Sequence, residues 1–483
     1  MVVDVVIVGA GLSGIGAAYH LQEKCPQKSY VILEGRDSLG GTWDLFRYPG
    51  IRSDSSMHSL GYKFKPWREA KAIADGPSIL NYVRETAVEN GIEQHIRYRH
   101  RVRRAEWSSE TATWTIQAEV GELAEPLTIE CNFLQLCAGY YSYESGYTPD
   151  FKGRERFKGS IIHPQAWPED LDYRDKQIVV IGSGATAVTL IPELAKEAAH
   201  VVMLQRSPTY MFPTPDKDRL ANILRKILPE KVAYGMTRWR NVKLERYFYD
   251  QARKKPAKAK QRMIDMVRDF LPPDYDVETH FTPDYNPWDQ RVCLVPNGDL
   301  FEAISAGSAS VVTDHIETFT ENGILLKSGQ ELAADIIITA TGLNLEVMGG
   351  IEFAVDGEPV DFAQKITYRS MMFSDMPNLV LIFGYINASW TLGADLKSEY
   401  ACRLINHMDE TGTRQCTPRL RAEDKQMATQ PWVTNFSSGY MQRKLHLMPK
   451  QGSHEPWINS QNYPRDKKRI GRAPMEDGVL IFS

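Results

Sequence analysis

The chain has 483 residues, of which 42% are hydrophobic, so it is too long for one simple core and predicts two or three lobes. A net charge of −4 at pH 7 gives no overall attraction to phosphate backbones, which argues against general nucleic-acid binding. No apolar run reaches the ~18–20 residues of a membrane-spanning helix, so we expect a cytoplasmic protein without a transmembrane segment.

The cysteines are scattered, without a CxxC pair or a cluster with metal-ligand spacing. This distribution predicts reduced thiols, no disulfide framework and no metal site. The six positions are Cys25, Cys131, Cys137, Cys293, Cys402 and Cys416.

The chain begins with "VVIVGAGLSGIGAAYHL", which predicts a buried strand, a glycine turn and a helix. It lacks the basic n-region of a signal peptide. Gly9 permits the tight turn, Gly11 lets the backbone approach a phosphate, and Gly14 lets the helix pack against the strand. Ser13 offers its amide and hydroxyl to the same phosphate. We therefore predict that this loop binds a pyrophosphate.

The next predicted strand, "YVILE", ends at Glu34, twenty residues after Gly14. A carboxylate at this offset accepts hydrogen bonds from ribose hydroxyls and repels a 2'-phosphate. The first loop therefore suits FAD or NAD and does not suit NADP.

A predicted strand, "NFLQL", lies between Cys131 and Cys137, which are six residues apart. The two thiols share a face of that strand but lie roughly 20 Å apart along it, too far to form a disulfide. If the chain is a flavoprotein, one that reduces a disulfide is therefore disfavoured relative to one that sends electrons to oxygen.

The strand, turn and helix pattern recurs at "QIVVIGSGATAVTLIPELA". The following strand, "HVVMLQRSP", carries Arg206 and Ser207 where the first motif carries an acid. Arg206 is suited to charge-assisted hydrogen bonds with a 2'-phosphate, and Ser207 adds a donor, so we assign NADPH to this loop. The loop and helix-start residues are Gly182, Ser183, Gly184, Ala185, Thr186 and Ala187.

Residues 213–289 differ in character, with helical periodicity and the basic stretch "RKKPAKAKQR" at 253–262. We interpret them as a solvated helical insert that caps the substrate cavity. A patch that binds nucleic acid or an anionic membrane is the alternative.

Two dinucleotide loops in one chain predict electron flow from nicotinamide to flavin. A further buried strand is expected in "ADIIITATGL", residues 333–343. We predict an α/β fold with two Rossmann-like dinucleotide-binding domains and a helical insertion. The FAD-binding domain is expected at 1–140 and 341–483, the NADPH-binding domain at 147–212 and 290–340, and the insert at 213–289.

Two longer patterns carry a family resemblance. "FKGSIIHPQAWP" (157–168) matches every fixed position of FxGxxxHxxxWP, and "GGTWDLFRYPGIRSD" (40–54) fits [AG]GxWxxxx[FY]P[GM]xxxD. With these motifs the chain resembles the type I Baeyer-Villiger monooxygenases, class B flavoproteins, along essentially its whole length. The resemblance implies that FAD, NADPH and O2 convert ketones to esters or lactones, and that sulfides or thioamides are oxygenated as well.

The nearest alternative is an N- or S-oxygenating flavin-containing monooxygenase, whose related fingerprint lacks the Trp167 and Pro168 ending. A basic-helix binding module on a vestigial flavin fold is a second alternative, from another class. The sequence names neither the physiological ketone nor the oligomeric state.

The resemblance also implies roles for individual residues. In "YNPWDQRVC" it places the active-site cation at Arg291, beside the oxygen adduct of the flavin, with Asp54 as its partner. Gln290 stands where the family often has lysine. Arginine suits the role because it stays protonated in a dry pocket.

Other roles follow from the same resemblance. The fingerprint is expected to couple the two domains: Phe157 and Trp167 by packing, Pro168 and Gly159 through the backbone, and His163 by a hydrogen bond across the linker. The implied cofactor contacts are Thr42, Trp43, Asp44 and Leu45 at the flavin and ribityl chain, Arg52 and Ser53 at the nicotinamide side, Val102 at adenine, and Trp457 on a mobile loop over NADP.

Overall fold

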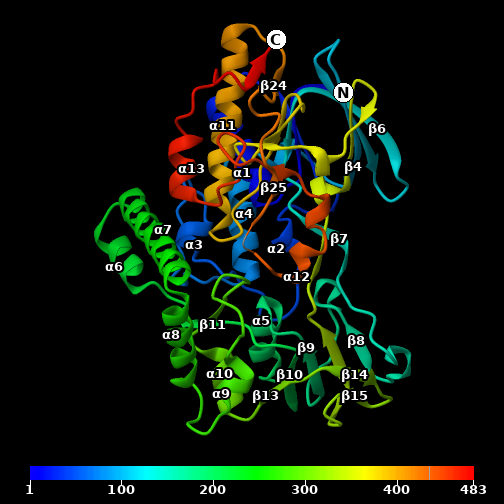
Figure 1. Ribbon diagram of the computed structural model, residues 1–483, viewed down its shortest axis with the longest axis vertical. Helices are drawn as coiled ribbons and strands as arrows, with labels where there is room; N and C mark the ends of the chain where they lie inside the picture. Colours follow the sequence, from blue (N-terminus) through cyan, green and yellow to red (C-terminus); the bar gives the residue numbers. More distant parts are fainter. Residues whose placement is uncertain (435) are drawn as a thin grey trace.

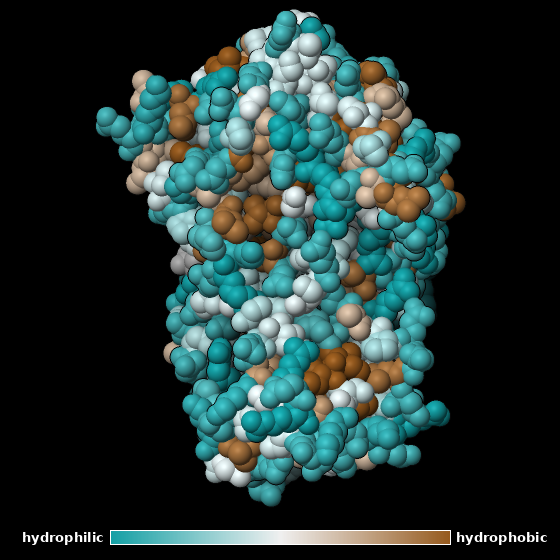
Figure 2. Space-filling model, turned by 90° about the vertical axis from the view of Figure 1, so that its right-hand side faces the viewer, coloured by the Kyte–Doolittle hydropathy of each residue, from teal (hydrophilic) through white to brown (hydrophobic). Residues whose placement is uncertain are grey.

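The computed structural model describes residues 1–434 and 436–483. Two sheets form an upper and a lower half, and both chain termini lie at the upper end (Figure 1). The helical insert projects from one side of the molecule, between the two halves. The face turned away from the insert is largely hydrophilic, with separate hydrophobic areas instead of a continuous band (Figure 2).

The first sheet has nine strands in the order β20-β19-β4-β5-β6-β1-β2-β3, and β23 also pairs with β6. Strand β1 runs parallel to β2 and β6, whereas β4, β5 and β6 form an antiparallel meander. The strands are β1 (Val2–Val8), β2 (Tyr30–Leu33), β3 (Ile96–Arg97), β4 (His100–Ser108), β5 (Thr113–Val120), β6 (Glu125–Leu136), β19 (Glu352–Val355), β20 (Glu358–Pro359) and β23 (Leu379–Leu381).

Strand β1 is an almost unbroken run of valine and isoleucine because both of its faces are covered. One face packs against α1 and α11, which contact each other along their length, and the other faces the core that contains Trp107 and Trp114. The helices of this half are α1 (Leu12–Lys24), α2 (Thr42–Leu45), α3 (Met57–Leu60), α4 (Gly76–Glu89), α11 (Trp390–Thr411), α12 (Gly439–Gln442) and α13 (Tyr463–Arg469).

The second sheet has five parallel strands in the order β13-β10-β9-β17-β8. Helices α5 and α10 contact each other beside it, and a three-stranded antiparallel sheet, β14-β15-β16, lies at its edge. The elements are β8 (Ser160–Ile162), β9 (Gln177–Ile181), β10 (His200–Gln205), β13 (Ala309–Thr313), β14 (Ile316–Phe319), β15 (Gly323–Leu326), β16 (Glu331–Ala333), β17 (Ile336–Thr339), α5 (Ala185–Leu194) and α10 (Asp299–Ser305).

Short strand pairs connect these parts. Strands β7 (Tyr141–Gly146) and β18 (Leu343–Leu345) pair antiparallel where the chain passes between the two sheets. Strands β11 (Met211–Thr214) and β12 (Cys293–Pro296) pair parallel at the two ends of the insert. The remaining pairs are β21 (Thr367–Tyr368) with β22 (Met372–Phe373), β24 (Cys416–Pro418) with β27 (Leu480–Phe482), and β25 (Gln430–Pro431) with β26 (Lys450–Gln451).

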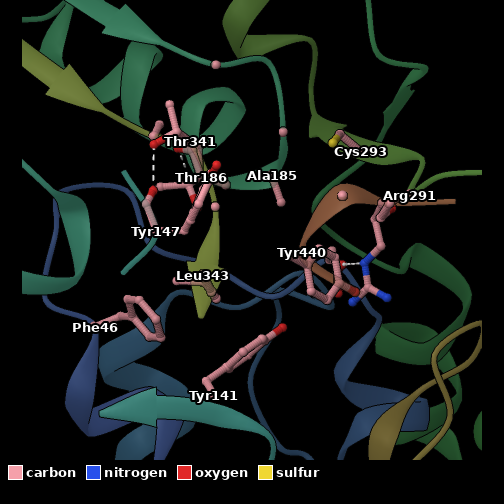
Figure 3. Close-up of a pocket in the computed structure, with 18 of the residues that line it drawn as sticks. Phe46, Tyr141, Tyr147, Ala185, Thr186, Arg291, Cys293, Thr341, Leu343 and Tyr440 are labelled. Carbon is pink, nitrogen blue, oxygen red and sulfur yellow. Dashed lines mark hydrogen bonds and ion pairs between the residues drawn. The ribbon is translucent and has the colours of Figure 1, made fainter. Parts of the chain in front are cut away.

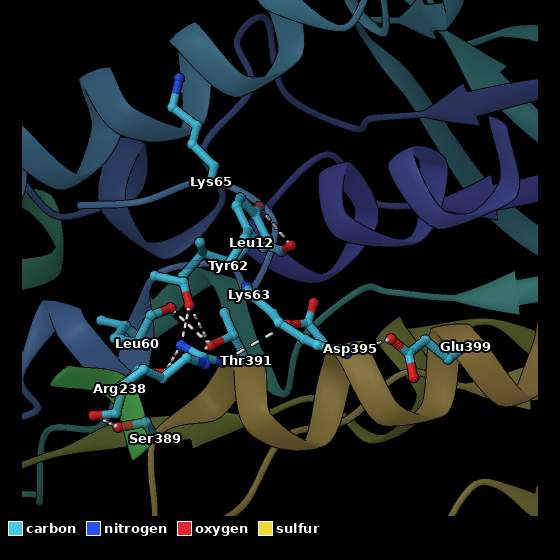
Figure 4. A network of polar contacts seen from close by, with 12 residues as sticks. Leu12, Leu60, Tyr62, Lys63, Lys65, Arg238, Ser389, Thr391, Asp395 and Glu399 are labelled. Atoms are coloured by element: carbon cyan, nitrogen blue, oxygen red, sulfur yellow. Dashed lines mark hydrogen bonds and ion pairs between the residues drawn. The ribbon is translucent and has the colours of Figure 1, made fainter. Parts of the chain in front are cut away.

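The insert consists of α6 (Arg219–Ile227), α7 (Glu230–Lys254), α8 (Pro256–Arg268) and α9 (Val277–Phe281). Helix α7 is attached to the upper half by Arg238, whose Nη1 donates to the carbonyl oxygens of Ser59 at 2.9 Å and Gly61 at 2.6 Å (Figure 4). Asp395 of α11 lies 3.8 Å from the same guanidinium and balances its buried charge. Across the described residues, no helix has the length and apolar content to cross a membrane.

Candidate active site

One large cavity between the two sheets is lined by both glycine loops, the 40–54 segment and Arg291. Figure 3 shows Phe46, Ala185 and Arg291 around it. These residues come from segments far apart in the sequence, so the meeting of the two halves creates the site. The predicted site residues that line it are Gly9, Gly11, Ser13, Thr42, Trp43, Arg52, Ser53, Asp54, Gly182, Ser183, Gly184, Ala185, Thr186, Arg206, Ser207 and Arg291.

The first glycine loop has the geometry of a pyrophosphate cradle. Gly9 has φ +100°, which L side chains rarely adopt, and a Cβ on Gly14 would lie only 1.8 Å from the carbonyl oxygen of Gly9. Helix α1 starts directly after Gly11, and no side chain caps its N-terminus. Its first amide groups are therefore available to an anion, and the loop fits a dinucleotide phosphate.

Glu34, at the end of β2, holds this loop. Its carboxylate accepts hydrogen bonds from the amides of Ala10 at 2.8 Å and Arg36 at 2.9 Å. Burial raises its pKa. Glu34 is 3% exposed and is not among the cavity-lining residues, so the contacts seen here are with the protein backbone.

The second glycine loop repeats the design. Gly182 has φ +133°, a Cβ there would meet the carbonyl oxygen of Ala340 at 2.4 Å, and a Cβ on Gly184 would meet nothing within 4 Å. Helix α5 follows Gly184 without a side-chain cap, and Ala187 is buried where the first loop has its third glycine. This open, uncapped helix start fits a second dinucleotide.

Arg206 and Ser207 follow β10 at the rim of the cavity, and both are exposed. Lys327 and His315, from the loops around β14 and β15, line the same cavity. They were not predicted, because no local pattern places residues so distant in sequence beside a glycine loop. The rim therefore offers more than one cationic or donor group to a phosphate.

The 40–54 segment enters the cavity only in part. Thr42 and Trp43, at the start of α2, line it. Asp44 is 2% exposed and instead pairs with Arg36 at 2.6 Å, and Leu45 packs on the core of the lower half. Neither Asp44 nor Leu45 is among the residues that line the cavity, so their contact with the flavin stays a prediction.

Arg52 lines the cavity, but its Nη2 donates to Asp299 of α10 at 3.2 Å and its Nη1 donates to the same carboxylate. This ion pair joins the upper half to the lower half. Asp299 is the first residue of α10, where a negative charge is favoured by the helix dipole. Ser53 bonds locally to the carbonyl oxygen of Ser55 at 2.8 Å.

Arg291 and Asp54 form the predicted ion pair. Nε of Arg291 donates to Oδ2 of Asp54 at 2.9 Å, and Nη1 donates to the carbonyl oxygen of Ile386 at 2.7 Å. The Asp54 carboxylate raises the pKa of Arg291, so the guanidinium is a fixed cation at any working pH. Its side chain is 35% exposed and points into the cavity beside Tyr440 (Figure 3).

Aromatic side chains surround this cation. Tyr140 precedes β7, Tyr141 begins it, and Tyr440 belongs to α12. Burial raises the pKa of all three, so their hydroxyls stay protonated. Arg443 stacks over the ring of Tyr147, with 3.5 Å from its guanidinium carbon to the ring centroid. Sequence reasoning missed these residues, since no local motif marks them.

The FxGxxxHxxxWP residues lie outside the cavity, at the junction of the two halves. Nε2 of His163 donates to the carbonyl oxygen of Gly342 at 3.1 Å, while Nδ1 accepts from the amide of Gln165 at 3.1 Å, so the predicted hydrogen bond is present. Burial lowers the pKa of His163 and favours this neutral tautomer. Both ring nitrogens of His163 thus bond to backbone groups, and its role in coupling the domains stays a prediction.

The other fingerprint residues act through packing. Phe157 is 9% exposed within the core around Phe319, Trp167 packs on the core of the lower half, and Pro168 is exposed. A Cβ on Gly159 would lie 2.2 Å from the carbonyl oxygen of Asp335. Glycine is thus required where this turn passes the sheet.

Two predicted contacts are not brought to the cavity. Trp457 is fully buried in the loop between β26 and α13, with its ring 5.9 Å from that of Tyr368, and its contact with NADP stays a prediction. Val102 lies in β4 with 6% exposure and packs in the core of the upper half. Neither residue is among those that line the cavity.

Residues 3–274 match the family model described as flavin-binding monooxygenase-like. The match covers more than half of the chain. The protein therefore belongs to the flavin-binding monooxygenase-like family, and the resemblance to class B flavoproteins is confirmed at this level.

Individual relatives extend the comparison over the whole chain. It is 53% identical over 481 residues to the FAD-containing monooxygenase EthA of Mycobacterium tuberculosis strain H37Rv, covering 99% of this chain and 97% of that protein. The complex of OTEMO with FAD and NADP has a TM-score of 0.76 at 20% identity, over 100% of this chain and 99% of that one. Cyclohexanone monooxygenase from Rhodococcus sp. Phi1, bound to NADP+, has a TM-score of 0.73 at 21% identity, over 88% and 87%. The structural likeness confirms the predicted α/β fold.

Proposed function

We propose that this protein is an FAD-dependent Baeyer-Villiger monooxygenase that uses NADPH and O2 to convert ketones to esters or lactones. The names of its relatives, an FAD-containing monooxygenase and a cyclohexanone monooxygenase bound to NADP+, support this class. Oxygenation of sulfides or thioamides belongs to the same proposal. The reaction balances as ketone, NADPH, a proton and O2 giving ester, NADP+ and water.

The chain divides, in this proposal, into an FAD-binding domain at 1–140 and 341–483, an NADPH-binding domain at 147–212 and 290–340, and a helical insert at 213–289. The strands of the nine-stranded sheet and those of the five-stranded sheet support the division. FAD fits the cradle of Gly9, Gly11 and Gly14, and NADPH fits that of Gly182 and Gly184. We infer a cytoplasmic location for the enzyme.

When bound in the first cradle, FAD would supply the redox chemistry that links NADPH oxidation to the activation of O2. The chain's own residues then hold charges and exclude water. Arg206 and Ser207 bind the 2'-phosphate of NADPH, and Arg291 holds negative charge that develops on oxygen next to the substrate carbonyl. Asp54 keeps the guanidinium in position, and the protonated hydroxyls of Tyr141 and Tyr440 border the same space.

The single observation that carries the proposal is a permanent cation facing a cavity shared by two dinucleotide cradles. Arg291 supplies it, with its charge fixed by Asp54 at 2.9 Å. A cation at this place favours a reaction in which an anionic oxygen nucleophile attacks a carbonyl.

The test is a panel of simple ketones, sulfides and tertiary amines incubated with holoenzyme, NADPH and 18O2. We expect ketone-dependent NADPH oxidation and an ester or lactone that carries one 18O atom. Amine or sulfide oxides without any ester would support an N- or S-oxygenating flavin-containing monooxygenase and contradict the proposal. NADPH oxidation that yields hydrogen peroxide with every compound would contradict both functions.

A further inference from the structure

The outer side of the α6–α7 hairpin carries an exposed apolar surface. Of the seventeen large hydrophobic residues that are exposed in the described part of the chain, nine lie between residues 220 and 248. Ile227 and Trp239 are 68% and 66% exposed. We call this surface the hairpin face; it comprises Leu220, Ile223, Ile227, Val232, Met236, Trp239, Leu244, Tyr247 and Phe248.

The spacing of these residues gives α6 and the first half of α7 one apolar outer side, and Leu244, Tyr247 and Phe248 add exposed apolar side chains along the second half of α7. In α6 they recur at positions i, i+3 and i+7, and in α7 they start with Val232, Met236 and Trp239 at i, i+4 and i+7. The other side of α7 holds buried Tyr234 and Arg238, which bond to the backbone of residues 59–62. The hairpin is thus attached through its inner side. Within the described residues, no other segment covers the hairpin face.

The hairpin face lies in the most basic region of the chain. Residues 219–262 contain fourteen lysine and arginine residues and three acidic ones, a formal charge of +11, whereas the whole chain carries −4 and the remainder therefore −15. Lys226, Lys231 and Lys243 are exposed and alternate with the apolar residues. Nine exposed large hydrophobic residues gathered on one helical hairpin are unusual on a monomer and mark an interaction surface.

We propose that the hairpin face docks on the surface of a lipid bilayer that contains anionic lipids. Apolar side chains flanked by lysines are the pattern of a helix that lies in the membrane interface, where the apolar side enters the acyl boundary and the basic groups meet the headgroups. A second copy paired face to face sets +11 against +11 and is disfavoured. A nucleic acid is also disfavoured as the partner, because its phosphate backbone offers no apolar environment for the exposed Ile227 and Trp239.

Docking in this orientation brings the bilayer close to the active site. Ser59 of α3 donates to Glu245 on the inner side of α7 at 2.6 Å, and the adjacent Leu60 lines the cavity. Only one helix therefore separates the hairpin face from the segment that borders the cavity. A lipophilic substrate dissolved in the bilayer is the kind of molecule that this arrangement serves.

The experiment is co-sedimentation of the holoenzyme with vesicles of phosphatidylcholine alone or of phosphatidylcholine with phosphatidylglycerol. We expect binding to the anionic vesicles, weaker binding at high salt, and little binding to phosphatidylcholine alone. A wild-type enzyme that binds neither kind of vesicle contradicts the proposal.

Two variants and one control separate the contributions. The triple variant Ile223→Ser, Trp239→Ser, Phe248→Ser should have a partition coefficient for anionic vesicles that is lower by about tenfold or more. The triple variant Lys226→Gln, Lys231→Gln, Lys243→Gln should show a similar reduction. The control Val88→Ser, Leu123→Ser removes exposed apolar residues outside the hairpin and should bind as wild type. Unchanged NADPH oxidation shows that each variant is folded.

The opposite results are equally clear. If the Ile223, Trp239, Phe248 variant binds anionic vesicles as strongly as the wild type, the proposal is overturned, because the apolar contacts would then contribute nothing. An oligomer in sedimentation velocity that this variant dissociates, without vesicle binding by wild type, assigns the hairpin face to a second copy and also overturns it.

Discussion

The guanidinium of Arg291 and the carboxylate of Asp54 meet at 2.9 Å although 237 residues separate them in the chain. Asp54 ends the 40–54 segment of the upper half, and Arg291 precedes β12, where the chain leaves the insert. The pair therefore depends on both halves of the molecule being in place. It supplies the cavity with one fixed positive charge.

Replacing Arg291 with alanine tests the proposed role of that charge. We expect Arg291→Ala to reduce product formation at least about hundredfold, because a stabilising donor is removed from the developing negative charge. Reduction of bound FAD by NADPH, followed by stopped-flow absorbance, should stay near the wild-type rate. Normal ester formation by the variant would rule out the role assigned to Arg291.

Asp54 acts through Arg291, so its variants should differ in severity. Asp54→Ala removes the partner of the guanidinium and is expected to lower kcat about ten- to hundredfold. Asp54→Asn keeps an oxygen acceptor and should retain more activity, whereas KM for NADPH should change little in both. Equal loss in both variants would show that geometry alone does not explain the pair.

Arg206 is exposed at the rim of the second cradle. Arg206→Ala is expected to raise KM for NADPH about ten- to hundredfold, because charge-assisted hydrogen bonds to the 2'-phosphate are lost. KM for NADH should hardly change, and Arg206→Lys should keep part of the preference. If both cofactors are affected equally, the phosphate contact is assigned to the wrong residue.

Glu245 predicts a pH-dependent stability. Burial raises its pKa to about 7, so the folded protein keeps a proton that the unfolded chain releases above its ordinary pKa. Stability should therefore fall as pH rises from about 4.5 to about 7 and then level off. Glu245→Gln keeps an oxygen acceptor for Ser59 and should not show this decline. Relative to the wild type, its free energy of unfolding should therefore be about 2 kcal/mol more favourable at pH 8 than at pH 5.

Thermal unfolding of wild type and Glu245→Gln at pH 5 and pH 8 measures the difference. The control is Glu410→Gln, which removes an exposed carboxylate at the end of α11 and should not alter the pH trend. If the free energy of unfolding of the wild type rises relative to that of Glu245→Gln between pH 5 and pH 8, the change has the opposite sign. That result would contradict a buried, protonated Glu245.

His163 joins the two halves through Gly342 and lies outside the cavity. We expect His163→Ala to slow flavin reduction by NADPH about ten- to hundredfold, because the lower half loses its alignment. FAD content should be unchanged. A variant that reduces flavin normally and still fails to form ester would instead indicate a role in the oxygenation step.

The sequence carried most of the local information. Glycine spacing predicted both cradles because only glycine accepts φ near +100° at Gly9 and the 1.8 Å approach at Gly14, and such backbone limits are written in the residues themselves. The predicted buried strand in 333–343 is β17, and the predicted helical insert contains α6 to α9. The motif between residues 40 and 54 was less decisive, since Thr42 and Trp43 line the cavity but Asp44 and Leu45 are not among its lining residues.

What the sequence by itself determined is the fold class, the two dinucleotide loops and the Arg291–Asp54 pair, because each depends on a short pattern or a family motif. Only the tertiary structure decided which side chains lie next to each other. Tyr440 lies beside Arg291, Trp457 is buried in the core, and Arg52 forms an ion pair with Asp299. It also decided which side of α7 is buried. Contacts of this kind depend on how distant segments pack, and packing is set by the shape of the whole interior and not by any local run of residues.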